Sequence, residues 1–247
     1  DIMSNQVPDR IEAPGVPSPS FVNSILEQAL LHKMSQDAPV RESSTLAFPA
    51  SSMGQCSIST LAETSGASLP IQRSFQDSGT GYVMMGSAIH RYLQDAVTAF
   101  AGLHNIIKHI EIEKRIVDPN RHLAATIDII INNSIALEIK TVSELQNNIF
   151  NHYAMQIAVQ QLLMPGVHVF MVQVRREDGA IRVIPTLSCE SFHGKVVEKV
   201  EDLIYAIKTR TLPAVDKPKC EYCNYYPCTV LDWERIFDIL QERLEST

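Results

Sequence analysis

The sequence predicts an α/β sandwich, in which helices pack on the faces of a central mixed β-sheet. Apolar residues recur with a helical period from Met85 to Phe100, which predicts a helix that buries one side. Extended and helical segments then alternate, and the whole order is α-β-β-β-α-β-β-α-α. This order favours a sheet with helices on its faces.

The first extended segments are rich in isoleucine and valine, and they cover Ile107–Val117, His122–Ile131 and Ile135–Val142. Asn132-Asn133-Ser134 separates the second segment from the third. Asparagine tolerates the positive φ angles of tight hairpin turns, so these two strands are expected to pair in antiparallel fashion.

The remaining elements follow this hairpin. A helix is expected from about Leu145 to Met164, where Pro165-Gly166 would end it. A second strand pair is expected around the turn Glu177-Asp178-Gly179. Its strands, and the helices after it, cover Val167–Arg175, Ala180–Leu187, Glu190–Thr209 and Val230–Leu244.

The length and composition fit a globular protein. With 247 residues, the chain can bury one core, or one core and a small appended subdomain. No apolar run approaches the roughly 20 residues that span a bilayer, and the first residues do not resemble a signal peptide. We therefore expect an intracellular protein, cytoplasmic or nucleoid-associated, with no membrane segment. The net charge of −7 disfavours a general polyanion binder but is compatible with a local basic surface.

Five cysteines are present, and an odd number without an export signal does not indicate a disulfide framework. Three of them fall within nine residues, which indicates a metal site. Cys220 and Cys223 form a C-x2-C pair that can hold one metal in a tight turn, with Cys228 close behind. Cys56 is a candidate fourth ligand. A structural Zn²⁺ and an iron–sulfur cluster both suit four thiolates, and only the cluster would absorb near roughly 400 nm. Cys189 is expected to be buried.

Two acids and a lysine stand out on the predicted hairpin. Asp128 lies within a run of isoleucines, where a carboxylate is costly unless it is paired or bound to a metal. Glu138 and Lys140 are two residues apart, so they share one face of their strand while Ile139 faces the other way. The turn would bring both acids together, and a divalent cation would relieve their repulsion. The alternative is a salt bridge on an exposed sheet face.

The segment Asp128-x9-Glu138-Ile139-Lys140 resembles the core of the PD-(D/E)XK nucleases. Gly86-x3-His90 resembles the G-x-x-x-H helix of the RecB-like and Cas4-like branch of that superfamily. Gln156 lies where this branch has a Q-x-x-x-Y motif. One cysteine before the core and three after it also match the branch, whose members hold a [4Fe–4S] cluster with them.

This resemblance implies a restriction-endonuclease-like core and a metal-dependent deoxyribonuclease. His90, Asp128, Glu138 and the main-chain carbonyl of Ile139 would bind one or two Mg²⁺ or Mn²⁺ ions, and Lys140 would act in catalysis with the two acids. The residues implied to contact the substrate are Gln156, Tyr153 and Gln160. The ligands implied for the cluster are Cys56, Cys220, Cys223 and Cys228.

The same resemblance implies an exonuclease that acts on single-stranded DNA or DNA ends, in recombination, repair, or phage or CRISPR-linked DNA processing. Thr126 and Gln160 stand where the family has Gly and Tyr. They keep open the alternative of a catalytically inactive DNA-binding or scaffolding subunit that retains the nuclease fold. A zinc-stabilised interaction module with no DNA role is a further alternative, because a Zn²⁺ ion suits the four cysteines.

The expected domain organisation follows from these assignments. Residues 1–50 are rich in Ser and Pro and predict an arm with one possible docking helix, Phe21–Met34, through which a protein partner could bind. Residues 85–209 would form the nuclease core. Residues 51–84 and 210–247 would form a metal-cluster subdomain that joins the N- and C-terminal regions.

Overall fold

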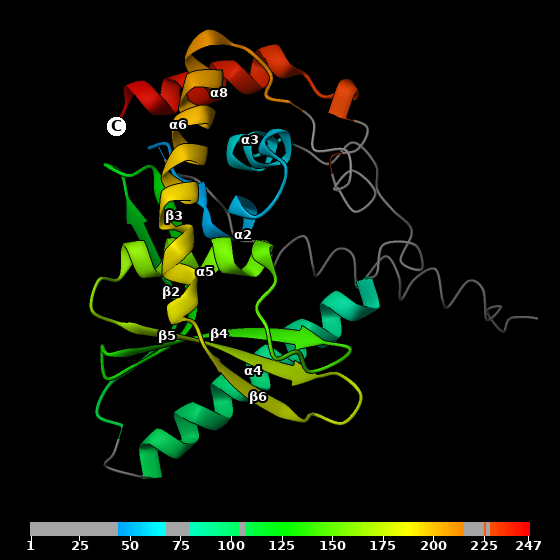
Figure 1. Cartoon of the computed structure of the whole chain (residues 1–247), viewed down its shortest axis with the longest axis vertical. Coiled ribbons are helices and arrows are strands. Elements are labelled where there is room, and N and C mark those ends of the chain that lie inside the picture. Colours follow the sequence, from blue (N-terminus) through cyan, green and yellow to red (C-terminus); the bar gives the residue numbers. More distant parts are fainter. Residues whose placement is uncertain (1–43, 68–79, 104–106, 215–224, 226–227) are drawn as a thin grey trace, which may run out of the picture. The chain divides into compact units, whose positions relative to one another are not determined.

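A computed structural model of the chain describes residues 44–67, 80–103, 107–214, 225 and 228–247. Residues 42–247 form one compact unit. Its described part is an α/β fold with a mixed, open six-stranded sheet flanked by helices (Figure 1). The expected class of fold is therefore confirmed at this level.

The strands of the sheet are β1 (Phe48–Pro49), β2 (Ile110–Asp118), β3 (Leu123–Ile131), β4 (Ile135–Val142), β5 (His168–Arg175) and β6 (Ile181–Pro185). Their order is β1-β3-β4-β5-β6. Strand β2 lies off this path and also pairs with β3. The pairs β1–β3 and β4–β5 are parallel, while the other neighbours are antiparallel. The strands that carry the acids and the lysine, β3 and β4, thus lie in the interior of the sheet.

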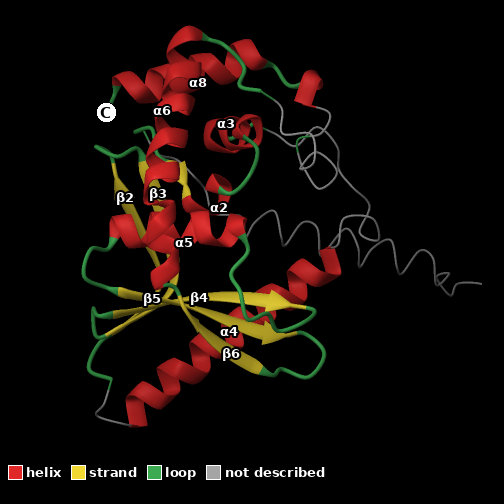
Figure 2. Cartoon of the chain, in the orientation of Figure 1, coloured by secondary structure: helices red, strands yellow, loops and turns green. Residues whose placement is uncertain are grey.

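The α-helices described are α2 (Ala50–Met53), α3 (Ser57–Ser65), α4 (Thr80–Leu103), α5 (Asn151–Leu163), α6 (His193–Thr209) and α8 (Trp233–Glu245). Short 3₁₀ turns, Leu187–Phe192 and Cys228–Val230, precede α6 and α8. Figure 2 shows these helices in red on either side of the yellow strands. Within the described ranges, no helix is long and apolar enough to cross a membrane.

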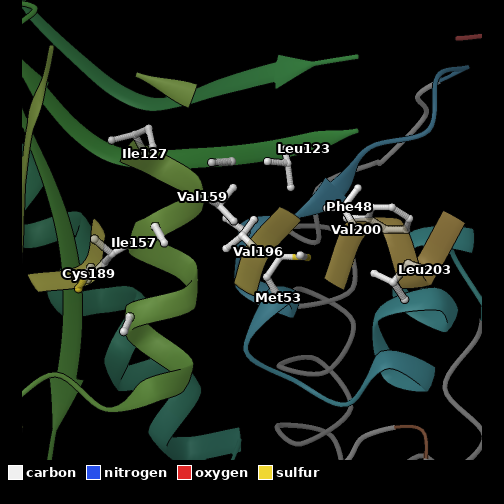
Figure 3. Close-up of a cluster of buried hydrophobic side chains, with 14 of the residues drawn as sticks. Phe48, Met53, Leu123, Ile127, Ile157, Val159, Cys189, Val196, Val200 and Leu203 are labelled. Atoms are coloured by element: carbon white, nitrogen blue, oxygen red, sulfur yellow. The ribbon is translucent and has the colours of Figure 1, made fainter. Parts of the chain in front are cut away.

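Two hydrophobic cores occupy the two faces of the sheet. The larger core gathers side chains from β1, α2, β3, α5 and α6, among them Phe48, Met53, Leu123 and Leu203 (Figure 3). The smaller core packs Ile139 and its neighbours in β3 and β5 against the inner side of α4. Helices α5 and α4 therefore cover opposite faces of β4 (Figure 1).

Strand β1 lies within residues 1–50, which were expected to form the N-terminal arm, so that expected boundary is wrong. Leu46 and Phe48 are fully buried, and the Phe48 amide donates a hydrogen bond of 2.7 Å to the carbonyl of His122. The Ser- and Pro-rich composition of residues 1–50 concealed the alternation of Leu46, Phe48 and Ala50, which places three apolar side chains in the core. The possible docking helix Phe21–Met34 lies outside the described residues.

The regions expected to form the metal-cluster subdomain contribute side chains to the larger core, which also covers the sheet. Met53 and Leu61 from the first region, and Phe237 and Leu240 from the second, are buried in that core. The Arg243 guanidinium of α8 also donates to the carbonyl of Thr64 in α3, at 2.5 Å. The described parts of residues 51–84 and 210–247 thus pack with residues 85–209.

The helix after β4 begins later than expected. Instead of starting at Leu145, α5 starts at Asn151, and the preceding loop is held on the sheet by two hydrogen bonds. The Gln146 amide donates to Gln173 Oε1 at 2.8 Å, and Arg182 donates to Asn147 Oδ1 at 2.6 Å. These long-range contacts outweigh the helical pattern of the segment.

Candidate functional site

The strands β3 and β4 stop pairing at the position of the first acid. The hairpin turn places Asn132 and Asn133 at φ values of 51° and 54°, as the turn chemistry predicted. Backbone pairing between the strands ends at Ile129 and Leu137. Asp128 precedes Ile129 by one residue, on the side away from the turn, and its carboxylate lies between the strands. Its Oδ2 accepts a hydrogen bond of 2.6 Å from the Ile139 amide. A side chain thus replaces a backbone acceptor where the strands separate.

Glu138 and Lys140 lie on the face of β4 that α5 covers. Their shared face is confirmed, since Ile139 packs into the smaller core on the opposite side. Lys140 Nζ is 2.6 Å from Glu138 Oε1, and Gln156 Nε2 donates to the same oxygen, also at 2.6 Å. Gln160 Nε2 donates to Glu138 Oε2. Because Glu138 is only 3% exposed, its charge is balanced by these donors rather than by bulk water.

His90 approaches Asp128 from the other side of the sheet. Its Nδ1 lies 3.7 Å from Asp128 Oδ1, which is an ion-pair distance. The spacing of the G-x-x-x-H motif has a physical reason: a Cβ on Gly86 would lie 3.0 Å from Thr141 Oγ1. Glycine therefore lets α4 lie close to β4, and His90, one helical turn later, reaches the acid.

The ionisable groups of the site act on one another. Burial raises the pKa of Glu138, and the charge of Asp128 adds to this rise against the opposing effect of Lys140. Burial would lower the pKa of Lys140, but the two carboxylates outweigh it, so that pKa is raised. Burial also disfavours charge on His90, yet the neighbouring Asp128 raises the pKa of the imidazole. The carboxylates of Asp128 and Glu138 thus favour the protonated, positively charged forms of Lys140 and His90.

The donor set suits a divalent cation by its chemistry. Carboxylate oxygens and an imidazole nitrogen bind Mg²⁺, Mn²⁺ or Zn²⁺ at about 2.0–2.2 Å, so a separation of 3.7 Å between His90 and Asp128 lets both reach one ion. In the arrangement observed, Glu138 is instead engaged by Lys140 and the two glutamines. Among the described residues, no three His, Cys, Asp or Glu side chains already surround a common point. An ion bound by all three ligands would therefore have to displace donors from Glu138.

One of the three residues predicted to contact the substrate, Gln160, is placed where it cannot do so. Gln160 is fully buried, so it cannot touch a substrate, and it holds Glu138 from behind. Its Oε1 has no hydrogen-bond partner within the described part of the chain. Gln156 also holds Glu138, whereas the half-buried ring of Tyr153 lies 5.2 Å from Lys140 Nζ. Substrate contact by Gln156 and Tyr153 stays a prediction.

Two residues of the site were not expected from the sequence. Gln94 is 8% exposed, and its Nε2 donates to Glu113 Oε1 at 2.5 Å and to the carbonyl of Asp128 at 3.4 Å. Glu113 and Asp128 lie between the register pairs Ile112–Ile129 and Lys114–Ile127, where neither has a partner in the β2–β3 register. The φ of Glu113 is 51°, a value that costs an ordinary residue about 1–3 kcal/mol. The available signal was the spacing of His90 and Gln94, which places both on one side of α4.

The cysteines are described only in part. Cys56 is buried at the N-terminus of α3, and the half-buried Cys228 begins the turn before α8. The Cys228 carbonyl accepts a hydrogen bond of 2.9 Å from the Trp233 indole. Cys220 and Cys223 lie outside the described residues. Cys189 is buried, as expected.

Comparison with known proteins bears on the fold alone. No protein-family model and no curated protein matches the chain. The crystal structure of SSO0001 is similar to it, with a TM-score of 0.55 and 19% sequence identity, over 83% of this chain and 93% of the other. An identity this low indicates a shared arrangement of helices and strands and carries no statement about activity.

Proposed function

We propose that the chain is a divalent-cation-dependent deoxyribonuclease of the PD-(D/E)XK type, related to the RecB-like and Cas4-like branch, with a restriction-endonuclease-like core. The observation that supports this most is the buried group at the point where β3 and β4 separate. Asp128, Glu138 and Lys140 meet there from two strands, and His90 reaches Asp128 from α4. Charged groups gathered in this way inside a sheet are costly to fold and are typical of catalytic sites.

Each residue has a distinct role in this proposal. His90, Asp128, Glu138 and the carbonyl of Ile139 would hold one or two Mg²⁺ or Mn²⁺ ions, which supply Lewis-acid polarisation of the scissile phosphate. Lys140, whose raised pKa keeps it protonated, would donate to a phosphate oxygen and stabilise the charge that develops there in the transition state. Water would attack phosphorus, a phosphorus–oxygen bond would break, and the leaving oxygen would take up a proton.

The two glutamines of α5 would act through Glu138. Gln156 and Gln160 each donate to a different oxygen of its carboxylate, so its orientation is fixed from both sides. The hydrogen bond from Gln160 to the charged form also opposes the rise in the pKa of Glu138 that burial causes. We therefore regard Gln160 as a positioning residue, in a place where the resembled family has a tyrosine.

A second candidate function also has an observation in its favour. Both oxygens of Glu138 already accept hydrogen bonds, from Lys140, Gln156 and Gln160, which satisfies the acid without a metal. A catalytically inactive subunit that keeps the fold and binds DNA as a scaffold would need no more than this.

The four cysteines are proposed to hold a [4Fe–4S] cluster, with a structural Zn²⁺ as the alternative. Cys56 and Cys228 lie at the starts of segments that join the N- and C-terminal parts of the core. Thiolates from both ends of the chain would then close a long loop, which favours a role in stability. DNA with single strands or free ends is the proposed partner, and the N-terminal arm is a proposed docking segment for a protein.

The test is hydrolysis of labelled single-stranded DNA by the purified full-length chain in Mn²⁺. We expect shorter products that chelation of the metal suppresses. Glu138→Gln is the matched variant: it keeps the size of the side chain but removes the charge, and it should lose the products. A folded wild-type protein that binds the DNA but yields no products would instead support the scaffolding function.

A further inference from the structure

Three aromatic rings lie together where α5 begins. The rings of Phe150 and His152 are almost parallel, with centroids 5.9 Å apart and an interplanar angle of 6°. Tyr153 contacts both, with its centroid 4.0 Å from His152 and 6.4 Å from Phe150. Lys140 Nζ lies 5.2 Å from the Tyr153 ring. The rings therefore lead from the acid–lysine site outward to Phe150.

Phe150 is neither a buried core residue nor a hydrogen-bonding cap of the helix. It is 52% exposed, although phenylalanine is among the residues most often buried. It also occupies the N-cap of α5, where Ser, Thr, Asp or Asn would accept a hydrogen bond from the first turn, and it makes no such bond. The position thus presents an aromatic face at some cost in helix stability.

The rings are held in place by their surroundings. A Cβ on Gly54 would lie 2.5 Å from the carbonyl oxygen of His152, so α2 packs directly against the backbone at the start of α5. The preceding loop is tied to the sheet through Gln146 and Asn147. A fixed surface loses little conformational freedom when it binds a ligand.

Positive charge accompanies the rings on the same face of the sheet. Lys140 pairs in register with Gln173 of β5, and Gln173 pairs with Arg182 of β6, so the three side chains form one row. Arg182 bonds the loop that carries Phe150, through Asn147. Exposed aromatic rings beside lysine and arginine match the repeating unit of a nucleic acid strand, which offers a flat base and a charged phosphate.

We propose that Phe150 and His152 form a stacking platform for an unpaired base of single-stranded DNA, beside the acid–lysine site. This inference rests on the proposed nuclease function for the use of that site. Bases within a duplex are already stacked on their neighbours, so the platform favours single strands and frayed ends. It would place a phosphate of the same strand towards Lys140.

The test measures binding of a fluorescently labelled oligothymidine to the full-length chain, with Ca²⁺ in place of Mn²⁺. Phe150→Ala should raise Kd by about tenfold or more, since one stacked base contributes on that scale. Phe150→Trp should restore the affinity. Tyr205→Ala, which removes an aromatic side chain that is 67% exposed on α6, is the matched control and should leave Kd unchanged.

Oligonucleotides that carry a single abasic site sharpen this test. When the missing base is the one that stacks on Phe150, the oligonucleotide should bind the wild-type chain more weakly. The same abasic site should not weaken binding to the Phe150→Ala variant any further. An unchanged Kd for Phe150→Ala would overturn the platform even if the wild-type chain cleaves DNA. A Phe150-dependent affinity in a chain that never cleaves would uphold the platform and reject the nuclease.

Discussion

Replacing Lys140 with alanine is expected to remove cleavage of single-stranded DNA almost completely. Lys140 lies directly beside the acids, with Nζ 2.6 Å from Glu138 Oε1. Loss of one preorganised donor to developing negative charge typically lowers the rate by about 10²- to 10³-fold. The rate of product formation in Mn²⁺, measured at saturating DNA, checks this expectation.

The fold should survive this substitution. Gln156 and Gln160 still donate to Glu138, and a buried acid with a raised pKa can take up a proton when its cation is lost. Lys114→Ala is the matched control, because Lys114 forms an exposed ion pair with Glu111 on β2. Retained cleavage by a correctly folded Lys140→Ala variant would remove Lys140 from the chemistry.

Replacing Phe48 with alanine is expected to lower the free energy of unfolding by about 3–5 kcal/mol, the usual cost of removing a buried phenylalanine. Phe48 is fully buried in β1, between Leu123 of β3 and the helices of the main core (Figure 3). Chemical denaturation with a constant slope would report the loss as a shift of the midpoint.

The same exchange at Phe150 is the control for Phe48→Ala. Because Phe150 is half exposed, Phe150→Ala should change the free energy of unfolding by no more than about 0.5 kcal/mol. Similar losses in the free energy of unfolding for both variants would contradict the described burial of Phe48 and exposure of Phe150. If Phe48→Ala were as stable as the wild type, residues 46–50 would belong to the N-terminal arm and not to the core.

Local patterns predicted the part of the site that a few neighbouring residues determine. The strand Ile135–Val142 and the shared face of Glu138 and Lys140 follow from alternation alone, and both are confirmed. The hairpin turn follows from two asparagines that accept positive φ. These features need no information from distant parts of the chain.

Features that depend on distant contacts were not predictable. β1 is two residues long and owes its burial to Leu123 and Ala124, far along the chain. The burial of Gln160 results from packing of α5 on the sheet, which a helical pattern does not reveal. The left-handed conformation of Glu113 likewise occurs where the register of β2 and β3 is interrupted, and its residue type does not reveal that interruption.

The proposed metal centre requires His90, Asp128 and Glu138 to bind one ion together. Anomalous diffraction from crystals soaked in Mn²⁺ measures this directly. We expect a peak in contact with all three side chains, with Lys140 Nζ displaced from the Glu138 oxygen that it contacts in the described structure. Crystals that show no Mn²⁺ there, at a concentration that occupies other sites, would contradict the proposed metal centre.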